Sequence, residues 1–312
     1  MTASFRFSGH ETFPCRYAWL PKAIGVISEK PELLADDKKS MVALGLGKNM
    51  VRATKFWVQA CGMARTLERG TRFEVTELGQ QILGRKGHDR FLEDLRTLWL
   101  IHWELSTHVD EPLFAWDFLL NRWPHPELSK SSALKAFRHE SNHLDHSREL
   151  SDITLEQHFD TFLHSYVPTR SRKGEIQEDN LDCPLVELRL LEPVGEKRVD
   201  GSPKHEALYA FRRDAKPEIC ADLFLYFVET FWQKRRANEQ TLTFRDVATA
   251  AGSPGQVLKL REEDVRERLE QLHRDSNGVY SYRESATLQQ LSRTKIVGAK
   301  PLLNAVYRKG RD

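Results

Sequence analysis

Residues 38–75, KKSMVALGLGKNMVRATKFWVQACGMARTLERGTRFEV, decide the fold of the N-terminal third of this chain. A short helix is predicted over residues 39–44, ending at Gly45, because glycine readily adopts the left-handed conformation that closes a helix. Asn49 is the predicted N-cap of a second helix, 49–61, in which apolar residues recur at helical spacing. Gly62 is expected to end this helix.

Two strand-like runs follow the predicted helix pair. Residues 64–68 and 72–76 flank Arg69-Gly70-Thr71, and this pattern predicts a β-hairpin. A closing helix capped by Thr76 is predicted over residues 76–83. A helix, a turn, a second helix and a hairpin in this order are typical of a winged-helix module.

The second predicted helix is the natural recognition helix of such a module. Lysine and arginine on its exposed side would neutralise DNA phosphates, and arginines on the hairpin would reach the DNA backbone beside it. The alternative is a winged helix that contacts only protein. The predicted DNA-binding residues are Lys48, Asn49, Arg52, Lys55, Arg65, Arg69 and Arg72.

Residues 216–285 repeat the same outline. We expect a helix starting at Pro217, a short helix capped by Thr243, a turn at 252–255, a helix over 260–273 and a wing from Asn277. Glutamates dilute the arginines of the helix at 260–273, so this copy is structural, dimer-forming or DNA-binding.

Residues 91–165 are predicted to be helical, and residues 193–205 to form a connection or a hairpin tip. The predicted fold class is therefore mainly α with small β-hairpins (α+β), with winged-helix modules near both ends joined by a helical middle. We expect three domains, over residues 1–90, 91–215 and 216–312.

Charge is segregated along the chain, although the net charge is only +2. Residues 1–90 carry +6, residues 91–200 carry −9 and residues 201–312 carry +5. Two basic ends around an acidic middle place positive potential where a polyanion could bind. Ordinary charge scatter is the alternative.

The composition excludes several classes of protein. Hydrophobic residues make up 40% of the 312 residues, which is too many for a disordered chain. Four widely spaced cysteines form no C-x-x-C pair and fit a reducing cytoplasm. No apolar run approaches the length of a membrane span, so we expect a cytoplasmic protein with no membrane contact.

The run Gly9-His10-Glu11-Thr12-Phe13 and the nearby Arg16 form the best catalytic candidate. Cleavage of a phosphodiester needs a base, a positive group for the pentavalent phosphate and often a metal. His10, Glu11 and Arg16 could supply these roles. The alternative is a buried polar cluster that pins the N-terminal arm to the core.

Three further motifs bear on cofactors. Asp179 and Asp182 could bind Mg²⁺ or another divalent metal, although an acidic loop that caps a helix is the alternative.

The zinc-peptidase pattern H-E-x-x-H is matched by His139-Glu140-Ser141-Asn142-His143. However, its flanks are charged and no third ligand falls at the metzincin offset, so we expect no zinc. Residues 45–49 lack the first glycine and the Ser/Thr of a P-loop, so we expect no bound nucleotide cofactor.

Three runs together resemble one bacterial family. They are GHETF-x-x-R-x-x-W-L-x-K at 9–22, LG-x-GKNMV at 44–51 with Trp57 beyond it, and EDNLDCPL at 178–185. The chain is similar from Phe7 to about His273 to the SspB family, which is found beside DNA phosphorothioation genes. This resemblance implies a DNA-nicking protein of an anti-phage system that acts on double-stranded DNA with an ATPase and a sulfurtransferase. A non-catalytic DNA-binding specificity subunit of the same system is the alternative, and a zinc peptidase is a third reading.

Overall fold

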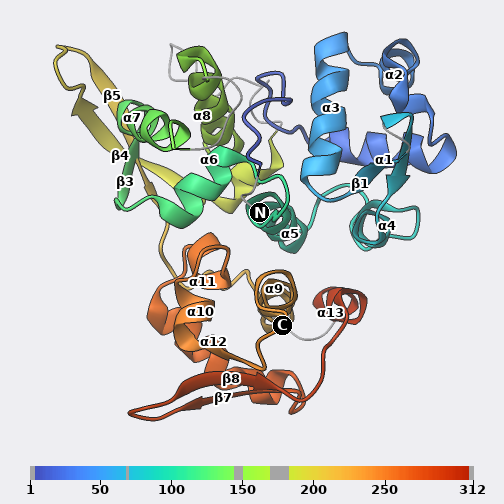
Figure 1. Ribbon diagram of the computed structural model, residues 1–312. Coiled ribbons are helices and arrows are strands. Elements are labelled where there is room, and N and C mark those ends of the chain that lie inside the picture. Colours follow the sequence, from blue (N-terminus) through green and yellow to red (C-terminus); the bar gives the residue numbers. More distant parts are fainter. Residues whose placement is uncertain (1–3, 68–69, 144–149, 169–182, 309–312) are drawn as a thin grey trace.

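The computed structural model describes residues 4–67, 70–143, 150–168 and 183–308. In these residues the fold is α+β, as predicted, with helices packed around small antiparallel sheets (Figure 1). The elements of the N-terminal part are α1 (Trp19–Glu29), the short helix η1 (Leu33–Ala35), α2 (Asp37–Leu44), α3 (Lys48–Ala60), β1 (Ala64–Leu67), β2 (Arg72–Val75) and α4 (Glu77–Leu83).

Local sequence signals explain most of these N-terminal boundaries. Gly45 closes α2 with a φ of 67°, and Gly62 follows α3 with a φ of 70°, both as predicted. Thr76 caps α4 by accepting a hydrogen bond from the backbone N–H of Gly79, which is also confirmed. The prediction that Asn49 caps α3 is wrong, because the helix begins at Lys48 and Gly47 is its N-cap.

The predicted N-terminal hairpin is confirmed. β1 and β2 pair antiparallel, with Ala64 opposite Val75 and Leu67 opposite Arg72. The backbone N–H of Phe73 also donates to Pro31 O at 2.9 Å, which ties the hairpin to the segment between α1 and α2.

The middle part contains more strand than its sequence predicts. The helix expected from Phe91 begins only at Leu95, because Leu92 has a φ of 61° and Asp94 caps the helix. Residues 193–205 do form a hairpin, but its long strands and a third strand, β3 (Glu127–Ser129), were missed. The elements are α5 (Leu95–Ser106), α6 (Phe114–Asp117), the π-helical turn η3 (Phe118–Arg122), β3 (Glu127–Ser129), α7 (Lys130–Ser141), α8 (Asp152–Tyr166), η5 (Pro184–Leu188), β4 (Leu191–Arg198) and β5 (His205–Phe211).

The C-terminal part follows the predicted order with shifted boundaries. The first helix begins at Ala221 rather than at Pro217, and Pro254 and Gly255, expected in the turn at 252–255, lie in a short helix. The Thr243 cap is confirmed, and Asn277 and Gly278 lead into the wing with positive φ. The elements are α9 (Ala221–Arg235), β6 (Thr241–Thr243), α10 (Phe244–Ala248), α11 (Pro254–Val257), α12 (Glu262–Asp275), β7 (Tyr280–Glu284), β8 (Gln289–Arg293) and α13 (Ala299–Val306).

A buried chain of hydrogen bonds joins the middle part to the C-terminal part. The carbonyl of Val257 lies 3.1 Å from Nε2 of His102 on α5, so this nitrogen carries the proton and donates. Nδ1 of a neutral His102 then accepts from the hydroxyl of Tyr166 at 2.8 Å, and that hydroxyl accepts from the indole N–H of Trp116 at 2.9 Å. Figure 1 shows α5 between the upper and lower parts of the molecule, where this chain runs.

No helix in the described ranges is long and apolar enough to cross a membrane. Apolar residues of all three expected domains belong to one buried cluster. The domain boundaries at 90/91 and 215/216 therefore stay predictions.

The buried His102 makes stability depend on pH. Burial lowers the pKa of His102 to about 4, whereas the ordinary value is 6.5, so the unfolded chain takes up a proton that the folded protein excludes. The contribution of neutral His102 to the free energy of unfolding is therefore complete above pH 6.5, and it is lost progressively as the pH falls toward 4. The loss reaches about 2 kcal/mol at pH 5. The free energy of unfolding is measured by urea unfolding at pH 7.5 and pH 5. Its decrease between these pH values should be smaller in His102→Gln than in the parent by this amount. An equal decrease in both proteins would contradict the role of His102.

Candidate nucleic-acid interface

His10 of the GHETF run lies inside the protein. The residue is 3% exposed, and its ring stacks nearly parallel to the ring of His158 on α8, with centroids 5.4 Å apart. Nε2 of His10 lies 3.1 Å from Nδ1 of His158, and Nδ1 of His10 lies 3.2 Å from Oγ1 of Thr161. The imidazole therefore fastens the N-terminal segment to α8.

Two backbone N–H groups donate to this histidine pair. That of Ala115 donates to Nε2 of His158 at 3.0 Å, which places the proton of a neutral His158 on Nδ1, toward His10. That of Thr12 donates to Nδ1 of His10 at 3.1 Å, which places the proton of a neutral His10 on Nε2, toward His158. Because only one proton fits between the two rings, these two backbone hydrogen bonds compete.

Both rings are neutral near pH 7. Burial, together with the positive charge of Arg6, lowers the pKa of His10 to about 4. Burial and the neighbouring His10 lower the pKa of His158 as well. A buried, neutral and doubly bonded imidazole supports the anchoring alternative for His10 over the role of a solvent-facing base.

The backbone around His10 is strained. Glu11 and Thr12 have φ values of 50° and 65°, a conformation that is uncommon for a residue with a side chain and costly for the branched Thr12. Gly9 has a φ of 108°, and a Cβ at this position would lie 2.8 Å from the Phe56 ring on α3. The turn therefore needs its glycine and its buried histidine to hold this shape.

The other two predicted catalytic residues lie nearer the surface. Glu11 and Arg16 are both partly exposed. The guanidinium of Arg16 lies 5.9 Å from the ring centroid of Phe13 and 5.6 Å from that of Trp19. His10 thus points into the core, whereas Glu11 and Arg16 can be reached from outside.

Only the first turn of α3 is open to a ligand. Lys48, Asn49 and Arg52 are exposed, so two cations and an amide lie at the start of the helix. Lys55 is different, because its side chain is 15% exposed and its Nζ donates to Asp37 at 2.7 Å. This hydrogen bond lowers the pKa of Asp37, whose other oxygen lies 3.6 Å from Nε of Arg52.

Gly47 leaves the N-terminus of α3 uncovered. It is the N-cap residue, it offers no side chain to cap the helix, and its φ of −68° suits any residue. A Cβ added there would meet nothing within 4 Å. Packing against the described part of the chain therefore does not require glycine at this position.

Two of the three predicted wing arginines lie in described residues, and one of these two is paired with a carboxylate. Arg65 pairs with Glu74 across the hairpin at 2.6 Å, and Arg72 is exposed on β2. Arg69 lies outside the described residues.

The predicted metal ligands Asp179 and Asp182 also lie outside the described residues. Within those ranges, no group of three or more His, Cys, Asp and Glu is placed to hold a metal ion. Cys183 is buried, and burial raises the pKa of its thiol, in keeping with a core residue rather than a nucleophile.

The H-E-x-x-H residues lie at the end of α7. The rings of His139 and His143 are 4.8 Å apart and exposed, and Glu140, the base of a zinc peptidase, is bound to Arg122 at 3.0 Å. The run at residues 45–49 joins two helices rather than following a strand, unlike a P-loop.

Sequence reasoning missed His158, Thr161 and the backbone N–H of Ala115, which position His10. A single histidine inside an amphipathic helix gives no signal by itself. The large residues around it, which bury it, could have suggested a core role.

Comparisons with known proteins place the chain in a family. The family described as a protein of unknown function, DUF4007, matches residues 7–307, and the chain belongs to it. A crystal structure of SspB with bound magnesium ion matches with a TM-score of 0.83 and 25% identity, covering 99% of this chain and 91% of that one. A second SspB crystal structure matches with a TM-score of 0.82 and 24% identity over the same shares. The chain is therefore SspB-like over nearly its whole length, while no curated protein matches it.

The histidine pair predicts a large effect of one ring substitution. His158→Phe keeps an aromatic ring but leaves the backbone N–H of Ala115 and Nε2 of His10 without partners. Two unsatisfied buried groups should lower the free energy of unfolding by roughly 2–5 kcal/mol. The exposed His143 provides the control, because His143→Phe should change stability by less than about 0.5 kcal/mol. Equal urea midpoints for the two variants would show that the pair is not an anchor.

Proposed function

We propose that this chain is the DNA-binding nickase component of a bacterial DNA phosphorothioation system that acts in phage defence. The likeness to SspB along the whole chain supports this assignment, and so do the three sequence runs. A non-catalytic DNA-binding specificity subunit of the same system is the alternative. Both readings include a cytoplasmic location, double-stranded DNA, and ATPase and sulfurtransferase partners.

We assign the N-terminal part as a winged-helix module. The order α1, α2, α3, β1, β2 and the tight turn between α2 and α3 support this assignment. So does the hydrogen bond from Phe73 to Pro31, where a winged helix usually pairs a short first strand with its wing. In this arrangement α3 is the recognition helix.

We assign the C-terminal part as a second winged-helix module. α9, α10 and α12 precede the hairpin β7–β8, and β6 pairs with β8 to give the sheet order β6-β8-β7. The exposed side of its third helix carries Glu262, Glu263, Glu267 and Glu270. Arg266 is bound to Glu284 and Arg268 to backbone carbonyls, so we assign this copy a structural or protein-binding role.

The observation that carries the proposal is the exposed first turn of α3. Its backbone N–H groups have no side-chain cap, and Lys48 and Arg52 stand beside them. A helix N-terminus with neighbouring cations is a favourable place for a phosphate. Since the rest of α3 is largely buried, DNA would have to approach this end.

The strained turn lies close enough to α3 to act on the same DNA. Phe56 contacts the turn, with its ring centroid 5.7 Å from that of His10, and Arg52 lies one helical turn, about 6 Å, before Phe56. We propose that Glu11 positions the attacking group and that Arg16 stabilises the charged phosphate. His10 holds this turn in place.

A divalent metal ion is a further part of the proposal. Mg²⁺ or another divalent ion would stabilise negative charge on the phosphate. Asp179 and Asp182 stay its proposed ligands. The described residues bring together no group of three or more metal ligands, and the proposed roles of Glu11 and Arg16 require none.

DNA binding predicts a defined salt response for a double variant. Lys48→Glu with Arg52→Glu removes two phosphate contacts, so the slope of log K against log salt should fall by about 1.8. Lys55 is left in place, because breaking its bond to Asp37 would also disturb the fold. Lys86→Glu with Arg90→Glu is the matched control, since both residues are exposed in the loop after α4.

Duplex DNA binding at several salt concentrations checks this prediction. The control should keep the affinity and the slope of the parent protein. Parent-like binding by the Lys48 and Arg52 variant would remove α3 as the interface.

Nicking predicts that Glu11→Gln is inactive but folded. The amide keeps the shape of the side chain and removes its charge, so conversion of supercoiled plasmid to open circle should slow by roughly 10²-fold or more. Melting temperature and duplex affinity should stay those of the parent. Glu111→Gln, at another exposed carboxylate, serves as the control.

The same plasmid assay separates the two candidate functions. A parent protein that binds duplex DNA but does not nick it, with or without Mg²⁺ and its partner proteins, would favour the specificity subunit. A fully active Glu11→Gln would instead show that the nicking residues lie elsewhere.

A further inference from the structure

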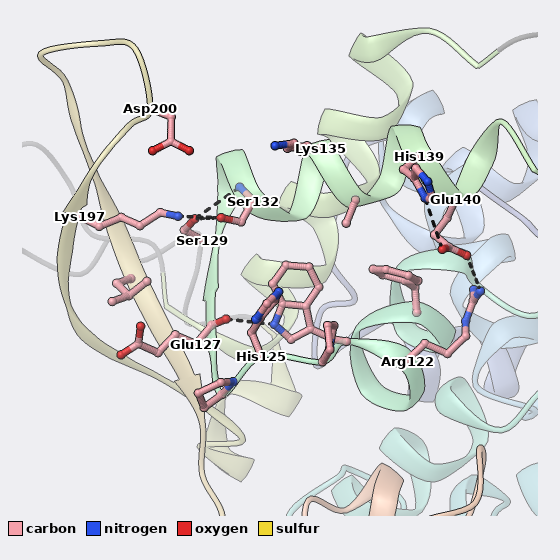
Figure 2. A pocket seen from close by; sticks show the side chains of 16 residues that line it. Arg122, His125, Glu127, Ser129, Ser132, Lys135, His139, Glu140, Lys197 and Asp200 are labelled. Carbon is pink, nitrogen blue, oxygen red and sulfur yellow. Dashed lines mark hydrogen bonds and ion pairs between the residues drawn. The ribbon is translucent and has the colours of Figure 1, made fainter.

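A cavity of about 770 Å³ lies between α7, the segment that follows η3 and the β4–β5 hairpin (Figure 2). This volume is within the range of pockets that bind small molecules and cofactors. None of the residues proposed to bind DNA at α3 lines the cavity. It is therefore separate from the α3 surface.

One face of α7 forms the first wall. Ser132, Lys135, Ala136, His139 and Glu140 line the cavity, and their spacing of three and four residues places them on the same side of the helix. Ala136 in the middle of this row has a small side chain.

The opposite wall is aromatic and fixed in position. Phe118 and Trp123 line it together with His125, whose ring lies 5.2 Å from that of Trp123. The indole N–H of Trp123 donates to Glu127 O at 3.0 Å, so its orientation is set. Two prolines, Pro124 and Pro126, limit the freedom of the loop around His125.

Some of the charged side chains around the cavity are already paired within the protein. Arg122 binds Asp117 and Glu140, each at 3.0 Å. Lys197 donates to Oγ of Ser132 at 2.6 Å, and Glu206 accepts from the backbone N–H of Ser131 at the start of α7. Lys135, on α7, and Asp200, at the hairpin tip, extend their charges from exposed positions.

The charges that line the cavity restrict the chemical class of ligand that it can bind. Three formal cations (Arg122, Lys135, Lys197) and three carboxylates (Glu127, Glu140, Asp200) line the cavity, so it does not select a simple anion. A ligand that offers both amino donors and a negative group would use both signs. The aromatic side chains that line the cavity add a preference for a planar ring.

We propose that this cavity binds one unstacked nucleotide. The base lies between the wall of Trp123 and His125 and the small Ala136. Glu127 and Asp200 accept hydrogen bonds from the amino groups of the base, as carboxylates do from cytosine. Lys135 contacts the phosphate. The nucleotide is either free in solution or part of a single strand, and stacking on aromatic side chains serves both.

Two substitutions test the cavity by different means. Ala136→Phe fills the space for the base without changing charge, and Lys135→Glu reverses the phosphate contact. Lys204→Glu, at an exposed position on the β4–β5 hairpin outside the cavity lining, is the matched control. Probes are the four deoxynucleoside 5′-monophosphates and a single-stranded oligodeoxynucleotide, measured by titration calorimetry and fluorescence anisotropy.

The parent and the control should bind at least one probe, and both cavity variants should bind it roughly tenfold or more weakly. Binding of the monophosphates identifies a free nucleotide as sufficient, and binding of the oligonucleotide alone identifies a strand. If Ala136→Phe melts below the parent, Lys135→Glu at an exposed position carries the test.

A parent that binds neither probe would overturn the proposal, and so would cavity variants that bind like the control. Duplex binding through α3 is measured separately with the Lys48 and Arg52 variant. If the proposed duplex binding at α3 fails, the measurements of nucleotide binding at the cavity can still be interpreted.

Discussion

The burial of Trp57 is the constraint on which the N-terminal half depends. Its indole N–H donates to Phe13 O at 2.9 Å, and its ring packs edge-on against Trp116 at 5.9 Å. Trp116 in turn donates to Tyr166, which leads through His102 to Val257 in the C-terminal part. α3 is thereby held from its centre, and only its first turn is left to meet a ligand.

The same burial explains why the GHETF turn can be strained. Two successive residues with left-handed backbone conformation cost free energy, and the His10–His158 pair and the packing of Gly9 on Phe56 hold them in place. Nδ1 of His10 also contacts the backbone N–H of Thr12 and Oγ1 of Thr161, and these contacts restrain the turn further. A turn held at several points suits a site whose side chains must stay in fixed positions.

Sequence could predict those parts of the fold that local chemistry decides. Gly45, Gly62, Thr76 and Thr243 end or cap helices by rules that act within a few residues, and all four were predicted correctly. Only the tip of the β4–β5 hairpin was anticipated, because β4, with Pro193 and Gly195, is largely exposed. β3 was missed because it lies far before its partner β5 in the sequence. His10 was singled out, but its partner His158 lies 148 residues away, and only the tertiary fold shows that this histidine is buried.

Gly47 offers the most direct test of the central claim, that DNA phosphate meets the uncapped start of α3. Gly47→Asp places a carboxylate where it can cap the helix, and nothing within 4 Å opposes its Cβ. Gly298→Asp makes the same change at the N-cap of α13. We predict that both variants melt at or above the parent temperature and that only Gly47→Asp loses duplex binding, by roughly tenfold or more. Undiminished duplex binding by a stable Gly47→Asp protein would contradict the account.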